Sequence, residues 1–478
     1  MYNPMMIIDG RPVLASDGSV HKILNPATGE LVGEVPSGGR QEAHQALTAA
    51  SRAFPAWAAT SPGKRADVLH QAASLVRELA DEMAVMLTLE IGKPLRASRR
   101  EVLGSADVLD YFAEEGKRAF GEWTISGAGK SRSLVIRQPI GVAALISPWN
   151  YPVDLLSWKV GAALAAGCTA VAKPSSMAPI AASAFIEAIN RAGAPPGVIN
   201  LVLGPGSTAG AELVESPLSQ KISFTGESAT GRWIMAAAAP RLKRLSLELG
   251  GSAPFIVCAD ADVKSAAEAC VQRAFNNAGQ ICISVNRVYL HHDVEEEFME
   301  LAIQRAGRLR VGSGMEDVDL GPLASEEQRK RTREHIEDAL SRGARLRLGG
   351  SEPEGEQYSR GHFFLPTILD RVDHSMRVMR EETFGPVMPV MTFKNLEEAV
   401  RLANQTEYGL AAYAYTNSLD AAVYLAERLE SGGVGINSNN VVDLQAPFGG
   451  WKQSGFGREL SHHGLEGYLE LKHVKIGL

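Results

Sequence analysis

The chain has 478 residues, of which 48 are Lys or Arg and 55 are Asp or Glu, so its net charge is −7. This balance excludes the basic surface that binding to nucleic acid or to an anionic membrane requires. At roughly 100 to 200 residues per domain, the length predicts two to four domains, each large enough to bury its own core.

The cysteine usage and the N-terminus indicate a cellular compartment. Four cysteines without a CxxC pair favour a reducing environment over a disulfide framework. The first residues lack the charged and apolar regions of a signal peptide, and no run of about 18 apolar residues occurs. These features predict a cytoplasmic protein that does not span a membrane.

The first predicted element is one amphipathic helix within Lys64 to Glu90. Apolar residues recur there at steps of three and four, and Gly92-Lys93-Pro94 supplies a helix stop. Further along, Gly121 to Arg137 and the alternating stretch Tyr468 to Ile476 have the pattern of β-strands. Because these two segments are not obviously part of any one predicted sheet, they are candidates for strand exchange between subunits. A surface hairpin is the alternative.

Four short apolar runs begin at Val142, Thr169, Val198 and Ile222, 24 to 29 residues apart. This spacing matches a strand-helix-strand crossover unit, and uninterrupted apolar runs are typical of strands that are buried on both faces. The sequence therefore predicts an α/β fold with a parallel, doubly wound sheet.

Two polar segments follow these runs directly. Pro148-Trp149-Asn150 comes after the first run and Lys173-Pro174-Ser175-Ser176 after the second. Since ligands bind beyond the carboxyl ends of the strands in such sheets, both segments should face one crevice.

A second alternation of helical and extended patterns, from about Ala278 to Phe448, predicts a second α/β domain.

Three short motifs contain candidate catalytic or cofactor-binding residues. Glu248 lies among leucines before Gly250-Gly251, and apolar surroundings raise the pKa of a carboxyl group as a general base requires; a solvated strand-end glutamate is the alternative. Phe224-Thr225-Gly226 with Gly231 has the form of a phosphate-binding turn, although it is no GxGxxG motif and an ordinary turn stays open.

The third motif, Gly279-Gln280-Ile281-Cys282, offers a candidate nucleophile. A lone cysteine is more often a buried small hydrophobic residue, which is the interpretation we give to the other three: Cys168, Cys258 and Cys270.

The combination of motifs along the chain is more specific for a protein family than any single motif. Seven motifs stand in an order and spacing that resemble the aldehyde dehydrogenase superfamily: Pro148-Trp149-Asn150, Lys173-Pro174-Ser175, Phe224-Thr225-Gly226, Leu247-Glu248-Leu249-Gly250-Gly251, Gly279-Gln280-Ile281-Cys282, Glu381-Glu382-Thr383-Phe384-Gly385-Pro386 and Pro447-Phe448-Gly449-Gly450. The resemblance spans essentially the whole chain and is nearest to the subgroup of succinate-semialdehyde and lactaldehyde dehydrogenases.

The resemblance implies the domain organisation. We expect a Rossmann-like cofactor-binding domain in residues 1–121 and 140–248 and an α/β catalytic domain in residues 249–447. Residues 122–139 and 459–478 should form a β oligomerisation arm, so that the protein is a homodimer or homotetramer.

The resemblance also implies the chemistry. Cys282 matches the nucleophile that adds to the aldehyde carbonyl, and Asn150 matches the side-chain donor of the oxyanion hole. After hydride transfer to a nicotinamide, Glu248 matches the residue that activates water to hydrolyse the thioester. Family members that pass the acyl group to coenzyme A generally lack this glutamate, so we expect hydrolysis to a carboxylic acid.

For the cofactor, Lys173 resembles the residue that binds the adenosine ribose, Glu382 the one that holds the nicotinamide ribose, and Phe384 the one beside the nicotinamide. Further positions that match family contacts are Ile146, Pro148, Trp149, Gly206, Gly210, Phe224, Gly226, Thr230 and Leu249.

Two positions bear on cofactor choice. Ser176 stands where NAD-preferring members often carry a glutamate that repels a 2′-phosphate, so we expect NADP to be accepted beside NAD. Glu227 departs from the serine that many members have; its carboxylate is able to cap the following helix but disfavours a nearby pyrophosphate.

Substrate choice follows from two further departures. At the positions that align with the carboxylate-binding arginines of semialdehyde dehydrogenases, this chain has Trp158 and Asn276. A substrate carboxylate would lack a charge-assisted partner there, so an uncharged aliphatic or aromatic aldehyde is expected. The tunnel walls should be Tyr151, Trp158, Ile281, Ile283, Val442 and Phe448. Asp154 either lies at the tunnel mouth, where it favours a cationic aldehyde, or faces water.

Other interpretations stay open. His291-His292 and His462-His463 lack the spacing of a ligand set, so we expect no catalytic metal. A cysteine-dependent thioester or ester hydrolase is the main alternative from another class, and a catalytically silent scaffold is the third.

Overall fold

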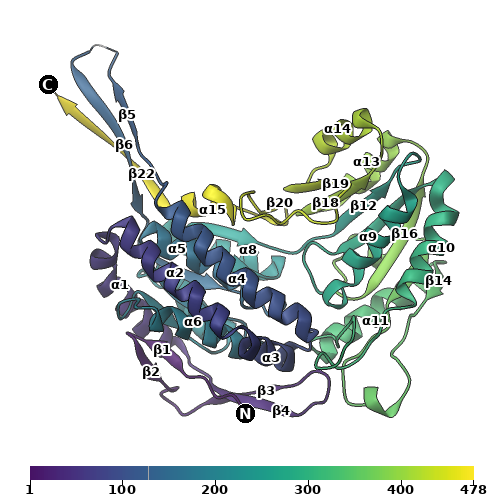
Figure 1. The fold of residues 1–478 in the computed structure, drawn as a ribbon, viewed down its shortest axis with the longest axis horizontal. Coiled ribbons are helices and arrows are strands. Elements are labelled where there is room, and N and C mark those ends of the chain that lie inside the picture. Colours follow the sequence, from purple (N-terminus) through teal and green to yellow (C-terminus); the bar gives the residue numbers. More distant parts are fainter. Residues whose placement is uncertain (128, 478) are drawn as a thin grey trace.

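The computed structural model describes residues 1–127 and 129–477, and its first half is built on the predicted parallel sheet (Figure 1). The strand order is β2-β1-β9-β8-β7-β10-β11-β21. The five central strands are parallel: β9 (Ile199–Leu201), β8 (Thr169–Lys173), β7 (Val142–Ile146), β10 (Lys221–Thr225) and β11 (Arg244–Glu248). All four predicted runs are strands, and the order reverses between β7 and β10.

The apolar character of these strands reflects their position between helices. Every residue of β8 and β10 is buried, so side chains on both faces of the sheet are covered. The helices around this sheet are α1 (Arg40–Ala58), α5 (Asp154–Ala166), α6 (Ile180–Arg191), α7 (Ala211–Glu215) and α8 (Ser228–Ala238). Both faces of the sheet are therefore part of the core.

The helix predicted within Lys64 to Glu90 is two helices, so that prediction was wrong in part. α2 (Pro62–Glu78) and α3 (Ala80–Ile91) meet at Leu79, whose ψ of 4° turns the chain. Acidic residues in the first turn of α3 favour a new helix N-terminus at this point. The predicted stop at Gly92 is confirmed, since this glycine has a φ of +79° and is followed by α4 (Leu95–Gly116).

The second half contains a seven-stranded sheet in the order β14-β15-β16-β13-β12-β18-β19, as the second α/β pattern predicts. Its strands are β12 (Ala253–Val257), β13 (Val285–His291), β14 (Arg345–Leu348), β15 (Thr367–Asp370), β16 (Val387–Phe393), β18 (Ala411–Tyr415) and β19 (Gly433–Ile436). Its helices are α9 (Val263–Phe275), α10 (Glu295–Ala306), α11 (Glu326–Ser341), α12 (Arg377–Arg380), α13 (Leu396–Asn404) and α14 (Leu419–Arg428).

The two β-segments without an obvious sheet join each other. β5 (Glu122–Ile125), β6 (Ser131–Pro139) and β22 (Leu469–Gly477) form a three-stranded antiparallel arm that stands out from the body (Figure 1). β22 pairs with β6 along its whole length, from Leu469 opposite Pro139 to Gly477 opposite Ser131.

Short elements connect these parts. β1 (Met6–Ile8) and β2 (Arg11–Val13) extend the first sheet beside β9, while β3 (Val20–Leu24) pairs with β4 (Leu31–Pro36). Near the C-terminus, β20 (Trp451–Lys452) pairs with β17 (Tyr408–Gly409), and β21 (Gly455–Phe456) returns the chain to the edge of β11 before α15 (Ser461–Glu466). Among the described residues, no helix has the length and apolar content to cross a lipid bilayer.

Candidate active site

The predicted site residues meet where the loops after β7 and β10 approach the second half of the chain. A cavity of about 110 Å³ lies there. It contains most of the predicted catalytic and nicotinamide-side residues in its wall: Pro148, Trp149, Asn150, Gly226, Glu227, Leu249, Cys282, Glu382 and Phe384. The switch point of the parallel sheet therefore lies beside the candidate nucleophile.

A tight turn presents Cys282. In η3 (Asn276–Gly279), Asn277 and Ala278 have φ values near +50° and Gly279 has a φ of +73°. A Cβ at Gly279 would lie 2.1 Å from the Gly385 carbonyl oxygen, so only glycine fits. Burial, with the nearby carboxylates of Glu382 and Glu248, raises the pKa of the Cys282 thiol to about 12. The thiol must therefore lose its proton to a base before it reacts.

Asn150 is held in place from both ends. Its Nδ2 donates to the Gln280 carbonyl at 3.0 Å, and its own carbonyl accepts from Lys93 Nζ at 2.9 Å and from Asn277 Nδ2 at 3.4 Å. These bonds connect Asn150 to the turn before Cys282, as an oxyanion hole requires.

Lys93 belongs to a buried ion pair that the sequence did not indicate. Its ammonium pairs with Glu101, and both side chains are almost fully buried. The other carboxylate oxygen of Glu101 accepts from the backbone N–H groups of Val153 and Asp154 at 3.1 and 3.3 Å. The pair thus fixes the segment from Asn150 to the start of α5.

Glu248 ends β11 with a carboxylate, and neither of its oxygens has a hydrogen-bond partner among the residues that the structure describes. A Cβ at Gly449 would lie 2.9 Å from Glu248 Oε1, so a glycine there leaves room for the carboxylate. Burial first, and then the like charge of Glu459, raise the pKa of Glu248 well above its ordinary value. This matches the apolar environment expected for a general base.

A second buried ion pair lies near Glu248. Lys159 Nζ pairs with Glu459 and donates to Thr225 Oγ1 at 2.7 Å, while Ser223 Oγ donates to Glu459 at 3.1 Å. The sequence analysis missed both charged residues, because they are 300 positions apart and only the fold brings them together.

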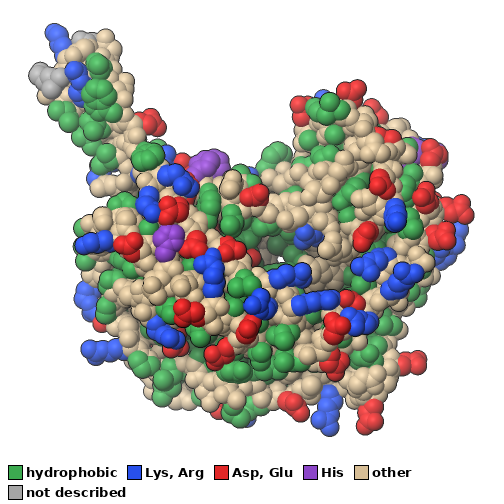
Figure 2. Space-filling view, in the orientation of Figure 1, with side chains coloured by type: hydrophobic (Ala, Val, Ile, Leu, Met, Phe, Trp, Pro, Cys, Tyr) green, Lys and Arg blue, Asp and Glu red, His purple; other side chains and the backbone are tan. Residues whose placement is uncertain are grey.

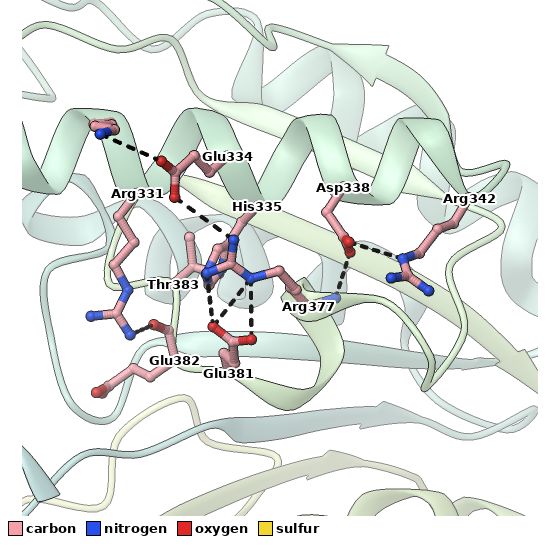
Figure 3. A network of polar contacts seen from close by, with 10 residues as sticks. Arg331, Glu334, His335, Asp338, Arg342, Arg377, Glu381, Glu382 and Thr383 are labelled. Atoms are coloured by element: carbon pink, nitrogen blue, oxygen red, sulfur yellow. Dashed lines mark hydrogen bonds and ion pairs between the residues drawn. The ribbon is translucent and has the colours of Figure 1, made fainter. Parts of the chain in front are cut away.

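The loop that carries Glu382 and Phe384 is held by one face of α11 (Figure 3). Arg331 donates to the Glu382 carbonyl at 2.5 Å, and Gln328 Nε2 donates to the Thr383 and Phe384 carbonyls at 2.8 Å each. These contacts support Phe384 in a left-handed conformation with a φ of +54°. Its ring meets Trp149 edge-on, with centroids 5.5 Å apart.

Glu382 points toward the connection between β11 and β12. Its Oε1 accepts from the Gly251 N–H at 2.9 Å, and burial raises its pKa to about 7. Gln328 and Arg331, which hold this loop and line the cavity, were missed by the sequence analysis. Their spacing of three on a helix is the signal that points to a shared face.

The other predicted cofactor residues extend away from this cavity. Ser176 lines a second hollow of about 250 Å³ and donates to the Gly204 carbonyl at 2.9 Å. A Cβ at Gly210 would lie 3.6 Å from Lys173 Cε, and Gly206 begins the same π-helical turn, η1 (Gly206–Gly210). Ile146 is the last residue of β7, where it pairs with Lys173 of β8 on one side and with Phe224 of β10 on the other.

Two further predicted positions lie at the start of α8. Thr230 is exposed on α8, outside the wall of the 110 Å³ cavity. Glu227 occupies the N-cap position of α8, but its side chain makes no capping hydrogen bond, so the expected cap is not formed. Away from this site, His291, His292 and Asp293 have ligand atoms within 4.8 Å of one another, a cluster that the sequence analysis did not expect.

The predicted substrate residues come from several separate segments of the chain. Ile281 and Ile283 flank Cys282 and are buried, and Trp158 meets Phe448 edge-on with centroids 5.1 Å apart. Tyr151 lines a cleft of about 550 Å³ together with Asp154 and Asn276, whereas Val442 is half-buried in the loop after β19.

Known proteins share this fold and sequence over the full length. The model of the aldehyde dehydrogenase family matches residues 13–474. The chain is 43% identical to the succinate-semialdehyde dehydrogenase (NADP+) of Escherichia coli and 41% identical to a glutarate-semialdehyde dehydrogenase of Pseudomonas putida, covering 100% of this chain and 98% of each relative. A crystal structure of an NADP-dependent enzyme from E. coli has a TM-score of 0.98 at 44% identity, covering 100% of this chain and 98% of that one.

The family model and these relatives confirm the resemblance seen in the seven motifs, and they confirm the expected mixed α/β architecture. The chain belongs to the aldehyde dehydrogenase family and is an oxidoreductase that acts on aldehydes.

Proposed function

We propose that the protein oxidises an aldehyde to the carboxylic acid with reduction of NAD(P), and that Cys282, Asn150 and Glu248 carry the chemistry. The observation that supports this most directly is the single 110 Å³ cavity that places Cys282 and Asn150 opposite Glu382 and Phe384. The experiment is to follow nicotinamide absorbance with a panel of aldehydes, each with NAD and NADP, beside an ester-cleavage assay. Aldehyde-dependent absorbance supports the proposal, and ester cleavage alone favours the hydrolase alternative.

The first half of the reaction joins substrate to sulfur. Cys282, once deprotonated, forms a C–S bond with the aldehyde carbon, and the carbonyl oxygen becomes an oxyanion. Asn150 Nδ2 and the Cys282 backbone N–H would donate to that oxygen, a contribution worth about 10²–10³ in turnover for each donor. NAD(P), when bound, supplies the hydride acceptor. Loss of the hydride leaves a thioester on Cys282.

The second half removes the acyl group. Glu248 accepts a proton from water, the resulting hydroxide attacks the thioester carbon, and the C–S bond breaks to release the acid and the Cys282 thiolate. The missing hydrogen-bond partners of the Glu248 carboxylate support this role, because both oxygens remain available to water.

The residues present fit a dinucleotide. The Lys173 ammonium is buried, and over the described part of the chain its one hydrogen bond goes to the Pro174 carbonyl at 3.4 Å. Burial lowers the pKa of Lys173 to about 8. An ammonium has three donors, so Lys173 is free to bind ribose hydroxyls. We propose that Lys173 holds the adenosine ribose and Glu382 the nicotinamide ribose.

Replacing Ser176 with glutamate should shift the cofactor preference toward NAD. A carboxylate beside the 2′-phosphate of NADP adds like-charge repulsion, so we expect KM for NADP to rise about 10-fold or more while KM for NAD changes little. Steady-state kinetics with both cofactors measure the change. A matched Ser176→Gln variant adds the bulk without the charge, and an equal effect of both variants would contradict the electrostatic explanation.

We propose that the preferred substrate has no carboxylate tail. The side chains at Trp158 and Asn276 are uncharged, and Ile281 and Ile283, which flank Cys282, are apolar and buried. Hexanal or benzaldehyde should therefore be oxidised with a higher kcat/KM than succinate semialdehyde. The second candidate is a semialdehyde substrate, which the similarity to the two semialdehyde dehydrogenases favours; a large preference for succinate semialdehyde would establish it instead.

Replacing Lys93 with methionine should lower kcat about 10- to 100-fold, because the Asn150 carbonyl loses the closer of its two donors and Glu101 is left as an unpaired buried charge. The double variant Lys93→Met/Glu101→Met removes both charges. It should recover much of the thermal stability but not kcat, because no donor to Asn150 is restored. Recovery of both quantities would contradict a positioning role.

The arm supports an oligomeric assembly, which we propose is a homodimer or homotetramer. Phe120, Trp123 and Leu471 are more than half exposed, and Figure 2 shows hydrophobic side chains along the arm. Light scattering after removal of residues 469–477 tests this proposal, since loss of β22 should dissociate the assembly.

We also propose a cytoplasmic location, supported by four cysteines that are all free thiols.

A further inference from the structure

Asp154 is a charged residue near the active site that the proposed reaction does not use. It lies at the start of α5 and lines the cleft of about 550 Å³ between α4, α5, α9 and α10. Tyr151 lines the same cleft and adjoins Asn150, whose side chain binds the turn before Cys282. The cleft thus reaches the segment that carries the oxyanion donor.

The Asp154 carboxylate has an unused oxygen. Oδ1 accepts from Trp158 Nε1 at 3.1 Å, whereas Oδ2 makes no hydrogen bond within residues 1–127 and 129–477. Over the same residues, no Lys, Arg or His lies within 4.0 Å of this carboxylate. A half-buried carboxylate without an ionic partner is unfavourable unless a cation or donor from outside completes it.

Among the described carboxylates that line the cleft, Asp154 is the one without an ion pair. Lys93 is neutralised by Glu101, and Arg96 is neutralised by Asp319 at 2.6 Å. Two further arginines on the rim, Arg100 and Arg305, are exposed, so water and salt screen them.

The same wall already stabilises one cation. The Lys93 ammonium lies 3.5 Å from the centroid of the Tyr151 ring. Burial first, and then Glu101 and Glu459, raise the pKa of Asp154 to about 7, while Lys93 lowers it. A bound cation would favour the charged form.

We infer that Asp154 is a specificity residue that binds the ammonium head of an ω-amino aldehyde, whose chain runs past Tyr151 and Trp158 to Cys282. This rests on the proposed function and extends its substrate class from uncharged aldehydes to cationic ones. The Asp154 carboxylate also repels a carboxylate tail, which adds to the lack of arginines at Trp158 and Asn276.

The test compares kcat/KM for aldehydes of equal length with an ammonium, a methyl or a carboxylate end, over chains of three to six carbons. The native enzyme should prefer the ammonium end at one chain length. Asp154→Asn should reduce that preference about 10- to 100-fold, the range of a hydrogen-bonded ion pair, and should raise kcat/KM for the carboxylate end. Asp319→Asn, which alters a paired carboxylate in the same cleft, should leave the preference unchanged.

A binding measurement separates this inference from the proposed reaction. Calorimetry with n-butylammonium should detect binding to the native protein and none to Asp154→Asn or Asp154→Ser. If aldehydes reduce the cofactor but Asp154→Asn keeps the native preference, the inference is overturned and the proposed function stands. If no aldehyde reduces the cofactor, the proposed function fails. The cation site at Asp154 would then be supported only if butylammonium binds to the native protein and not to the Asp154 variants, and it would be overturned otherwise.

Discussion

Replacing Cys282 with alanine should lower the rate of aldehyde-dependent cofactor reduction by about 10³-fold or more. No other residue of the cavity wall supplies a sulfur nucleophile, and without the C–S bond the aldehyde has no tetrahedral adduct from which hydride is lost. Absorbance of the reduced nicotinamide at saturating aldehyde measures the rate. Binding of the cofactor, followed by fluorescence quenching, should be unchanged.

The control for this variant is Cys270→Ala. Cys270 is fully buried beside Met388, 3.6 Å from its sulfur, so its replacement should affect stability rather than turnover. Full-speed reduction by Cys282→Ala would refute the proposed mechanism, whatever the control shows.

Replacing Glu248 with glutamine should stop the enzyme after one turnover. Cys282 and Asn150 remain, so the first hydride is transferred, but water is no longer activated and thioester hydrolysis slows by about 10²–10⁴-fold. Rapid-mixing absorbance should show a burst of one reduced cofactor per site followed by a very slow phase. Mass spectrometry should detect the acyl group on the protein.

The pH profile gives a second measure of Glu248. A base acts only when deprotonated, and burial raises the pKa of Glu248, so the native hydrolysis rate should rise with pH through that raised pKa. The Glu248→Gln variant should lose this rise. As a control, Glu382→Gln should reduce the burst phase itself, because Glu382 is proposed to hold the nicotinamide ribose. An unchanged pH profile in Glu248→Gln would contradict the general-base role.

The parts of the site that could be predicted are local in sequence. The strand runs at Val142 and Thr169 place the polar segments that follow them at one edge of the sheet, and the structure puts Asn150 and Lys173 there. Gly279 indicates the turn before Cys282, because glycine adopts a left-handed conformation without steric strain. These signals depend on a few neighbouring residues and so survive without knowledge of the fold.

The parts that were missed depend on long-range packing. The contact between Lys93 and Asn150 spans 57 positions, and Arg331 reaches Glu382 across 51. Nothing near Lys93 in the sequence distinguishes it from a surface lysine. The break at Leu79 was missed for another reason, since the apolar period continues from α2 into α3 while the backbone turns.

The pairing of β22 with β6 imposes an order on the biosynthesis of the arm. The strands are far apart in the chain, because the residues of β22 follow those of β6 by more than 300 positions. Until those residues leave the ribosome, one edge of the β5–β6 hairpin stays open to any other extended peptide. A chain that terminates before β22 would therefore carry an unprotected β5–β6 hairpin, which chaperones would have to shield or proteases remove.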